Sequence, residues 1–181
     1  MTESRDELVI VIGAGGTEKF ARFFQDAAET LATLGDQAGA TVHTANTFRT
    51  RRRTAGRRWN ALTRQAIDIA RRSVPPEHRI AGSLAPLEDC YRPDLSPADS
   101  EPEHREMADA LAAAGCDLIL CETFPHPEEA LTAARSAVRT GLPTWLSLTA
   151  GPYGSLMTPQ TLAETARRAV DLGGEAGLVN C

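Results

Sequence analysis

The sequence predicts an α/β fold of the (β/α)8 barrel type, built from about six βα units. Short apolar runs that are typical of buried parallel strands alternate with longer segments that carry one apolar helical face. The strand ends between Ile12 and Asn180 are spaced roughly 34 residues apart, near the ~31 expected for eight units in about 250 residues. A doubly wound sheet of six parallel strands is the competing fold.

Each predicted element follows from its local pattern. The strands are short apolar runs bounded by turn residues, at 8–12, 41–44, 80–83, 118–121, 145–148 and 176–180. The helices have helical apolar spacing or cap signals, at 17–34, 60–72, 103–114, 128–140 and 159–172. Thr158 is the expected cap of the last helix, because Pro159 suits a first helical turn. Four prolines make 84–102 a long loop.

The most informative stretch runs over 114–125, where a helix end and a Gly turn precede a strand and an acid. The run 118–121 is continuously apolar, as in a parallel strand that is covered on both faces. Glu122 falls where this strand leaves its sheet, and carboxylates at that end of parallel strands usually belong to a binding site. Cys121 alternates with Glu122, so we expect its side chain to face the helices.

Composition limits the class of protein. Hydrophobic residues make up 42% and charged residues 24%, as in ordinary soluble globular proteins, and the net charge of −5 argues against nucleic acid as a partner. We expect no membrane partner, because no apolar run approaches the ~18 residues of a membrane span. Nothing at the amino terminus resembles a targeting segment, and the four cysteines are widely spaced. We therefore expect a reduced, cytoplasmic protein.

Five short motifs, each at a strand's carboxyl end and in the same order, resemble those of the homocysteine S-methyltransferase family. They are Gly-Thr-Glu at 16–18, Thr-Ala-Asn-Thr-Phe at 44–48, Ala-Gly-Ser-Leu-Ala-Pro at 81–86, Cys-Glu-Thr-Phe-Pro at 121–125 and Gly-Leu-Val-Asn-Cys at 177–181. The resemblance covers the whole chain and implies a single domain over 1–181. It also implies that the last two βα units of the barrel are absent from this sequence.

The resemblance implies a zinc-dependent enzyme of methionine biosynthesis. It would move a methyl group from a sulfonium, ammonium or folate donor to the thiol of homocysteine, giving methionine. Zinc suits this chemistry, because a free thiol has a pKa near 8.5 and a bound metal ion removes its proton. Cys181 matches one family zinc ligand, and the other two, a Cys-Cys pair, have no counterpart in this sequence.

The resemblance also assigns substrate-binding residues. Glu122 matches the acid that holds the ammonium group of homocysteine, and Asn46 and Thr47 match residues that line its pocket. Glu18 is a further candidate acid, although Glu in a first helical turn is also favoured by the helix dipole. The alternative roles are a capping or salt-bridged carboxylate for Glu122 and an Asx turn for Asn46.

Several features depart from the family or stay open. The family has an Asp in its first strand where this sequence has Ile12 or Ala14. Of the other cysteines, only Cys90 falls in a loop on the binding face. Six arginines within 49–58 form either a solvated loop or a clamp for an anionic group. Residues 87–94 are either a surface loop or a lid.

Two functional hypotheses follow. The first is homocysteine methyl transfer with zinc, whose missing ligands would come from elsewhere. The alternative is a catalytically incomplete fragment, namely an amino-acid-binding or structural half-barrel without zinc chemistry. An open sheet leaves its first and last strands unpaired, which favours self-association or pairing with a partner chain.

Overall fold

A single parallel sheet organises the molecule. The computed structural model describes residues 10–12 and 18–180, and in this part of the chain the sheet has six strands. They are β1 (Ile10–Ile12), β2 (Val42–Ala45), β3 (Arg79–Leu84), β4 (Leu118–Phe124), β5 (Thr144–Thr149) and β6 (Ala176–Asn180). All neighbours pair in parallel. The described strands therefore need crossover connections, and helices supply them.

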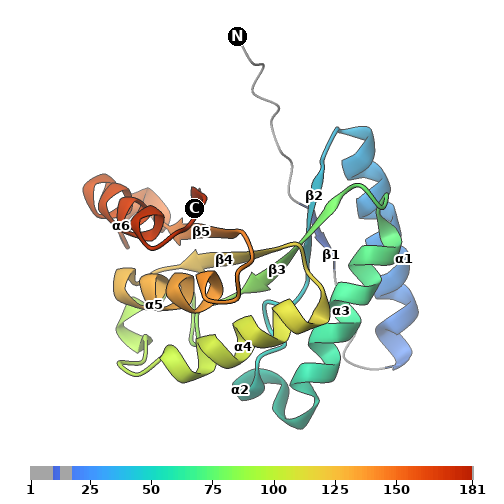
Figure 1. Cartoon of the computed structure of the whole chain (residues 1–181), viewed down its shortest axis with the longest axis horizontal. Helices are drawn as coiled ribbons and strands as arrows, with labels where there is room; N and C mark the ends of the chain where they lie inside the picture. Colours follow the sequence, from blue (N-terminus) through green and yellow to red (C-terminus); the bar gives the residue numbers. More distant parts are fainter. Residues whose placement is uncertain (1–9, 13–17, 181) are drawn as a thin grey trace.

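The strand order is β1-β2-β3-β4-β5-β6, which is the order of the sequence. Each right-handed crossover steps in the same direction, so the connecting helices lie on one face of the sheet. They are α1 (Glu18–Gln37), α2 (Arg52–Ala55), α3 (Trp59–Ser73), α4 (Glu101–Ala114), α5 (Pro127–Val138) and α6 (Pro159–Asp171). Figure 1 shows them along the outside of a curved sheet. The predicted barrel-type fold is confirmed, because a doubly wound sheet reverses its strand order at a switch point.

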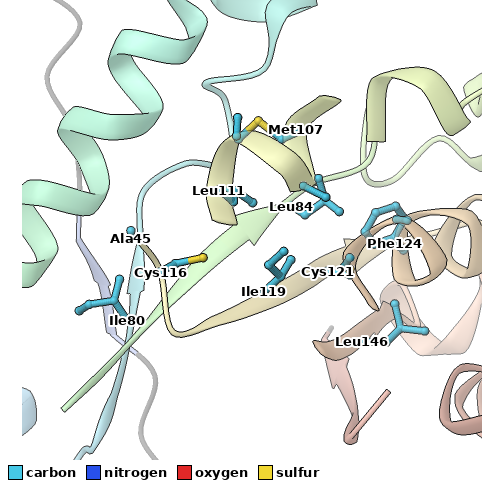
Figure 2. Close-up of a cluster of buried hydrophobic side chains, with 14 of the residues drawn as sticks. Ala45, Ile80, Leu84, Met107, Leu111, Cys116, Ile119, Cys121, Phe124 and Leu146 are labelled. Carbon is cyan, nitrogen blue, oxygen red and sulfur yellow. The ribbon is translucent and has the colours of Figure 1, made fainter. Parts of the chain in front are cut away.

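The main core lies between the strands and the helices. Ile119 and Cys121 of β4, Leu84 of β3 and Leu111 of α4 are at most 1% exposed and belong to one apolar cluster. Figure 2 shows the side chains of β3 and β4 meeting those of α4. Burying each large apolar side chain contributes roughly 1.5–3 kcal/mol. Cys121 faces the helices, as predicted from its alternation with Glu122.

A smaller apolar cluster covers the opposite, concave face of the sheet. It contains Val42, Ala81, Leu118, Leu120 and Trp145, each at most 9% exposed. These residues alternate along their strands with members of the main core. The concave face is therefore apolar toward the amino ends of the strands.

Strand β3 contains Gly82 and Ser83, which interrupt its apolar pattern. A Cβ atom at Gly82 would lie 2.9 Å from Cδ2 of Leu111 and 3.0 Å from Sγ of Cys116. Glycine therefore lets β3 and α4 approach closely in the centre of the sheet. This contact explains why a glycine stands in β3, although it weakens the apolar pattern that predicts a strand.

The predicted boundaries are correct to within a few residues, with two differences. Helix α2 and the 3-10 turns Gly56–Arg58, Pro93–Leu95 and Pro152–Gly154 lie in segments that were predicted as loops. These short turns have no apolar periodicity that a sequence pattern could detect. Strand β4 continues to Phe124, beyond the predicted end at Cys121.

Candidate functional site

The carboxyl end of β4 is irregular. Cys121 pairs with Leu146 of β5, but the next pair joins Phe124 to Leu148, so β4 has one residue more than β5 in this interval. Thr123 lies inside it with φ of 66°, a left-handed conformation that is rare for a β-branched residue. Bulges of this kind often re-aim side chains beside active sites. This bulge carries Glu122.

Glu122 is half-buried at the concave edge of the sheet and is connected to two neighbouring strand ends. The hydroxyl of Ser83, at the end of β3, donates a hydrogen bond to Oε1 of Glu122. The hydroxyl of Thr47, after β2, donates to the carbonyl oxygen of Ser83 over 2.8 Å. Burial raises the pKa of Glu122, and the hydrogen bond from Ser83 only partly opposes this. The result is a carboxylate whose charge is incompletely compensated.

A second hydrogen-bonded group joins β4, β5 and β6. Ser147 of β5 donates to Oδ1 of Asn180, and Nδ2 of Asn180 donates to the Thr123 hydroxyl over 3.4 Å. Both ends of the Asn180 amide are thus held, which fixes the carboxyl end of β6 against the bulge. These contacts show how the Asn180 side chain is oriented.

Polar side chains gather along the concave face toward the carboxyl ends of the strands. Two of them, Thr44 and Thr149, have buried hydroxyls without a hydrogen-bond partner among the described residues. By strand alternation Thr44 shares the concave face with Ala81, its register partner, and Thr149 shares it with Asn180. A buried hydroxyl without a partner costs free energy. Such groups are available to bind a polar ligand.

The structure brings some predicted site residues together and leaves others undecided. Glu122 and Thr47 are connected through Ser83, and Asn46 is half-buried directly before Thr47. Glu18 begins α1, but its side chain lies outside the described residues, and so does Cys181 as a whole. Sequence reasoning did not select Ser83, although its spacing from Ala81 in a strand predicts the same face.

The cysteines do not supply a zinc site within the described part of the chain. Burial raises the pKa of Cys116 to about 11 and raises that of Cys121 further still, so both stay protonated thiols in the core. The pKa of Cys90 is also raised, mainly by burial. Among residues 10–12 and 18–180, no group of three or more His, Cys, Asp or Glu could hold a metal ion. These residues therefore do not fit zinc.

The arginine-rich segment is largely engaged in contacts within the protein. Arg52 forms an ion pair with Glu106 of α4, and Arg53 pairs with Glu103 of α4 and with Glu88. Arg51 is only 7% exposed and donates to backbone carbonyl oxygens. These three guanidinium groups join the chain after β2 to α4 and its preceding loop, so they are not free to clamp a substrate anion.

Thr123→Gly tests whether the bulge is strained. A left-handed backbone costs a non-glycine residue roughly 1–2 kcal/mol, and the added freedom of Gly in the unfolded chain offsets about half of this. Because Gly also removes the hydroxyl that accepts from Asn180, Thr123→Ala, which removes the same hydroxyl, is the reference. We expect the free energy of unfolding in urea to be up to about 1 kcal/mol higher for Thr123→Gly than for Thr123→Ala. At Thr132, in the regular helix α5, Gly should instead be less stable than Ala. A Thr123→Gly variant less stable than Thr123→Ala would contradict strain at this position.

The site lies where barrel proteins of this class bind their ligands. Parallel strands in sequential order, outer helices and polar groups at the carboxyl ends of β2 to β6 define a (β/α)-barrel type protein with a binding site on that face. The family model described as homocysteine S-methyltransferase matches residues 36–181. The chain belongs to this family.

Solved structures agree in fold. The metallated form of the homocysteine methyltransferase MmuM from Escherichia coli has a TM-score of 0.71 and 22% identity, over 99% of this chain and 76% of that chain. The apo form gives 0.67 and 20%, over 99% and 73%. The carboxyl transferase domain of Rhizobium etli pyruvate carboxylase, with 3-bromopyruvate, gives 0.61 and 13%, over 94% and 26%. At these identities the similarity concerns the fold. No curated protein matches the chain significantly, and none of the described helices is long and apolar enough to cross a membrane.

Proposed function

We propose that this chain, as one domain, binds homocysteine for methyl transfer to its thiol, with Glu122 as the partner of the substrate's ammonium group. The observation that carries the proposal is the half-buried carboxylate on the β4 bulge, whose pKa is raised by burial and whose hydrogen-bond partner among the described residues is the Ser83 hydroxyl. An ammonium group at hydrogen-bond distance would supply the missing positive charge. Family membership supports homocysteine as the amino acid.

The other groups of the site have roles in binding. Ser83 orients the Glu122 carboxylate. The hydroxyls of Thr44 and Thr149, which have no partner among the described residues, are proposed donors to the substrate carboxylate. Asn46 and Thr47 are proposed to line the pocket, and Glu18 is a further proposed acid. In the reaction the thiol loses its proton and its sulfur forms a bond to the methyl carbon. The bond from that carbon to the donor atom breaks, and its electron pair stays with the donor.

Zinc would hold homocysteine as a thiolate, with Cys181 as one proposed ligand. Because the described residues do not fit a zinc site, the roles assigned to them concern substrate binding. The prediction for Cys181 is tested by the zinc content of the purified protein. We expect bound zinc to fall at least tenfold in Cys181→Ser and to be unchanged in Cys116→Ser, whose thiol lies in the core. Equal zinc in both variants would contradict a ligand role.

A binding module without methyl transfer is the second candidate. Leu178 and Val179 of β6, an edge strand of the sheet in the described part of the chain, are 37% and 64% exposed, so this strand presents an apolar surface there. A module of this kind would bind homocysteine without forming methionine.

Calorimetric titration with homocysteine, together with an assay for methionine using sulfonium, ammonium and folate donors, separates the candidates. We expect homocysteine to bind at least tenfold more tightly than alanine, which carries the same ammonium and carboxylate groups. Binding with methionine formation supports methyl transfer, and binding alone supports the second candidate. Absence of homocysteine binding would overturn both.

A further inference from the structure

The loop between β3 and α4 is clamped at a single residue, Leu87. The backbone N–H of Leu87 donates to Oε1 of Glu129 over 2.8 Å, and its carbonyl oxygen accepts from Nη2 of Arg51 over 3.0 Å. All three residues are at most 7% exposed. An acid from α5 and a base from the segment after β2 thus both hold the backbone of Leu87. Buried charged groups seldom occur without such partners. The pairing of Arg51 and Glu129 with Leu87 is therefore a specific contact and not an incidental one.

Glu129 also holds the other end of the same loop. Its Oε2 accepts a hydrogen bond from the Ser96 hydroxyl, while Nε2 of His104 donates to Oε1 over 3.1 Å. Residues 88–95, which we name the cap loop, run between these two attachment points. Tyr91 and Leu95 of the cap loop are 50% and 45% exposed. One buried carboxylate therefore fixes both ends of a largely exposed segment.

Charge strengthens the attachment. Burial alone would raise the pKa of Glu129, but hydrogen bonds from His104, from the N–H of Leu87 and from Ser96 outweigh it and hold the pKa below its usual range. The carboxylate is therefore ionised at neutral pH. Hydrogen bonds to an ionised acceptor are about twice as strong as those between neutral groups.

The clamp is connected to the candidate site through consecutive contacts. Arg51 donates from Nη1 to the carbonyl oxygen of Phe48 over 3.0 Å, so it holds the segment after β2 as well as Leu87. Thr47, in that segment, donates to the carbonyl oxygen of Ser83. Ser83 in turn donates to Glu122. Each step is a hydrogen bond within the described residues or a link between chain neighbours.

We propose that Glu129 is a positioning residue: it fixes both ends of the cap loop and, through Leu87 and Arg51, holds Ser83 where it orients Glu122. The substrate part of this inference rests on the proposed function, whereas the attachment of the cap loop does not. Residues 87–94 were expected to be either a surface loop or a lid. This assignment makes 88–95 a cap anchored at two points beside the binding face.

The attachment is tested by limited chymotrypsin digestion of the full chain. Glu129→Ala removes all three acceptor contacts, and we expect cleavage after Tyr91 to accelerate at least tenfold. Cleavage after Tyr153, which is fully exposed on the β5–α6 loop, should not change and serves as an internal control. Glu129→Gln keeps a carbonyl oxygen for Leu87 and His104, and its NH2 can donate to the Ser96 hydroxyl, so its cleavage rate should stay within threefold of wild type. Glu128→Ala, one residue earlier and exposed, is the matched control.

The link to Glu122 is tested by homocysteine affinity. We expect Glu129→Ala to raise the Kd for homocysteine about tenfold, whereas Glu129→Gln should keep most of the wild-type affinity. In a Ser83→Ala background the same Glu129→Ala change should raise the Kd less than threefold, because the connection is already cut. Should Glu129→Ala not fold, Ser96→Ala removes one attachment alone and should still accelerate cleavage after Tyr91.

The outcomes are separable. Unchanged cleavage after Tyr91 in Glu129→Ala and Ser96→Ala would overturn the attachment, whatever the substrate is. If the fold increases in Kd caused by Glu129→Ala and by Ser83→Ala simply multiply in the double variant, the positioning role would be overturned. If the wild-type chain fails to bind homocysteine, the proposed function and its substrate link fall together, and digestion alone still decides the attachment.

Discussion

Glu122→Gln is expected to raise the Kd for homocysteine about 100-fold, which corresponds to roughly 2.7 kcal/mol. The variant keeps the shape of the side chain and an oxygen that accepts from Ser83, but it loses the negative charge that we propose to bind the ammonium group of homocysteine. Removing one partner of a buried, hydrogen-bonded charge pair typically costs 2–5 kcal/mol, about the range expected here. Calorimetric titration of wild type and variant measures the change directly.

The same variant should be more stable than wild type at pH 7. Burial raises the pKa of Glu122 above its usual range, so the folded chain favours the protonated carboxyl. Such a group stabilises the fold below its unfolded pKa, and this contribution is lost as pH rises through the folded pKa. At pH 7 the wild type therefore bears the cost of an ionised carboxylate without its ligand. Gln has no such cost, and the stability difference in urea unfolding should shrink toward pH 4.

Glu128→Gln is the matched control, because Glu128 is an exposed acid that pairs with Arg168 on the surface. It should leave the affinity for homocysteine within twofold of wild type and change the stability by less than about 1 kcal/mol. A Glu122→Gln variant that binds homocysteine as tightly as wild type would contradict the assignment of Glu122. A variant less stable at pH 7 would contradict the charge argument.

Phe124→Ala is expected to lower the free energy of unfolding by about 3–5 kcal/mol. Phe124 is fully buried at the end of the β4 bulge, in the core of Figure 2, and its ring lies 5.6 Å from the His104 ring. Removing the ring leaves a cavity where β4 meets α4 and α5, because the surrounding helices relax only in part. For a chain of this size the melting temperature should fall by about 10 °C.

Tyr153→Ala provides the comparison for Phe124→Ala. Tyr153 is a fully exposed aromatic residue, so its truncation should change the free energy of unfolding by less than about 0.5 kcal/mol. Thermal unfolding followed by circular dichroism measures both variants. A loss below about 1 kcal/mol for Phe124→Ala would show that this part of the core is loosely packed.

The periodic part of the fold was predictable from sequence. The alternation of apolar strands with amphipathic helices predicted the parallel sheet and nearly all of its elements. Glu122 was predictable because an acid directly after an apolar strand falls at the binding end of a parallel sheet. Thr158 was correctly predicted as a cap, since it accepts a hydrogen bond from the N–H of Thr161.

The contacts around Glu122 were not predictable, because they join residues far apart in the chain. The hydrogen bond between Ser83 and Glu122 spans 39 positions, and that between Leu87 and Glu129 spans 42. The bulge at Thr123 cannot be detected from the alternation of apolar and polar residues by which a strand is recognised. The arginine-rich segment was ambiguous for the same reason, since its acidic partners lie mainly on α4.

The sequence by itself determined the class of fold and its order of elements, because local apolar periodicity and turn chemistry depend on neighbouring residues. It also determined the family through short motifs at strand ends. Only the tertiary structure decided which polar groups meet at the concave edge and that Arg51 and Glu129 hold the backbone C=O and N–H of Leu87. These features depend on how successive βα units pack side by side, which places residues 33 or more positions apart within hydrogen-bond distance.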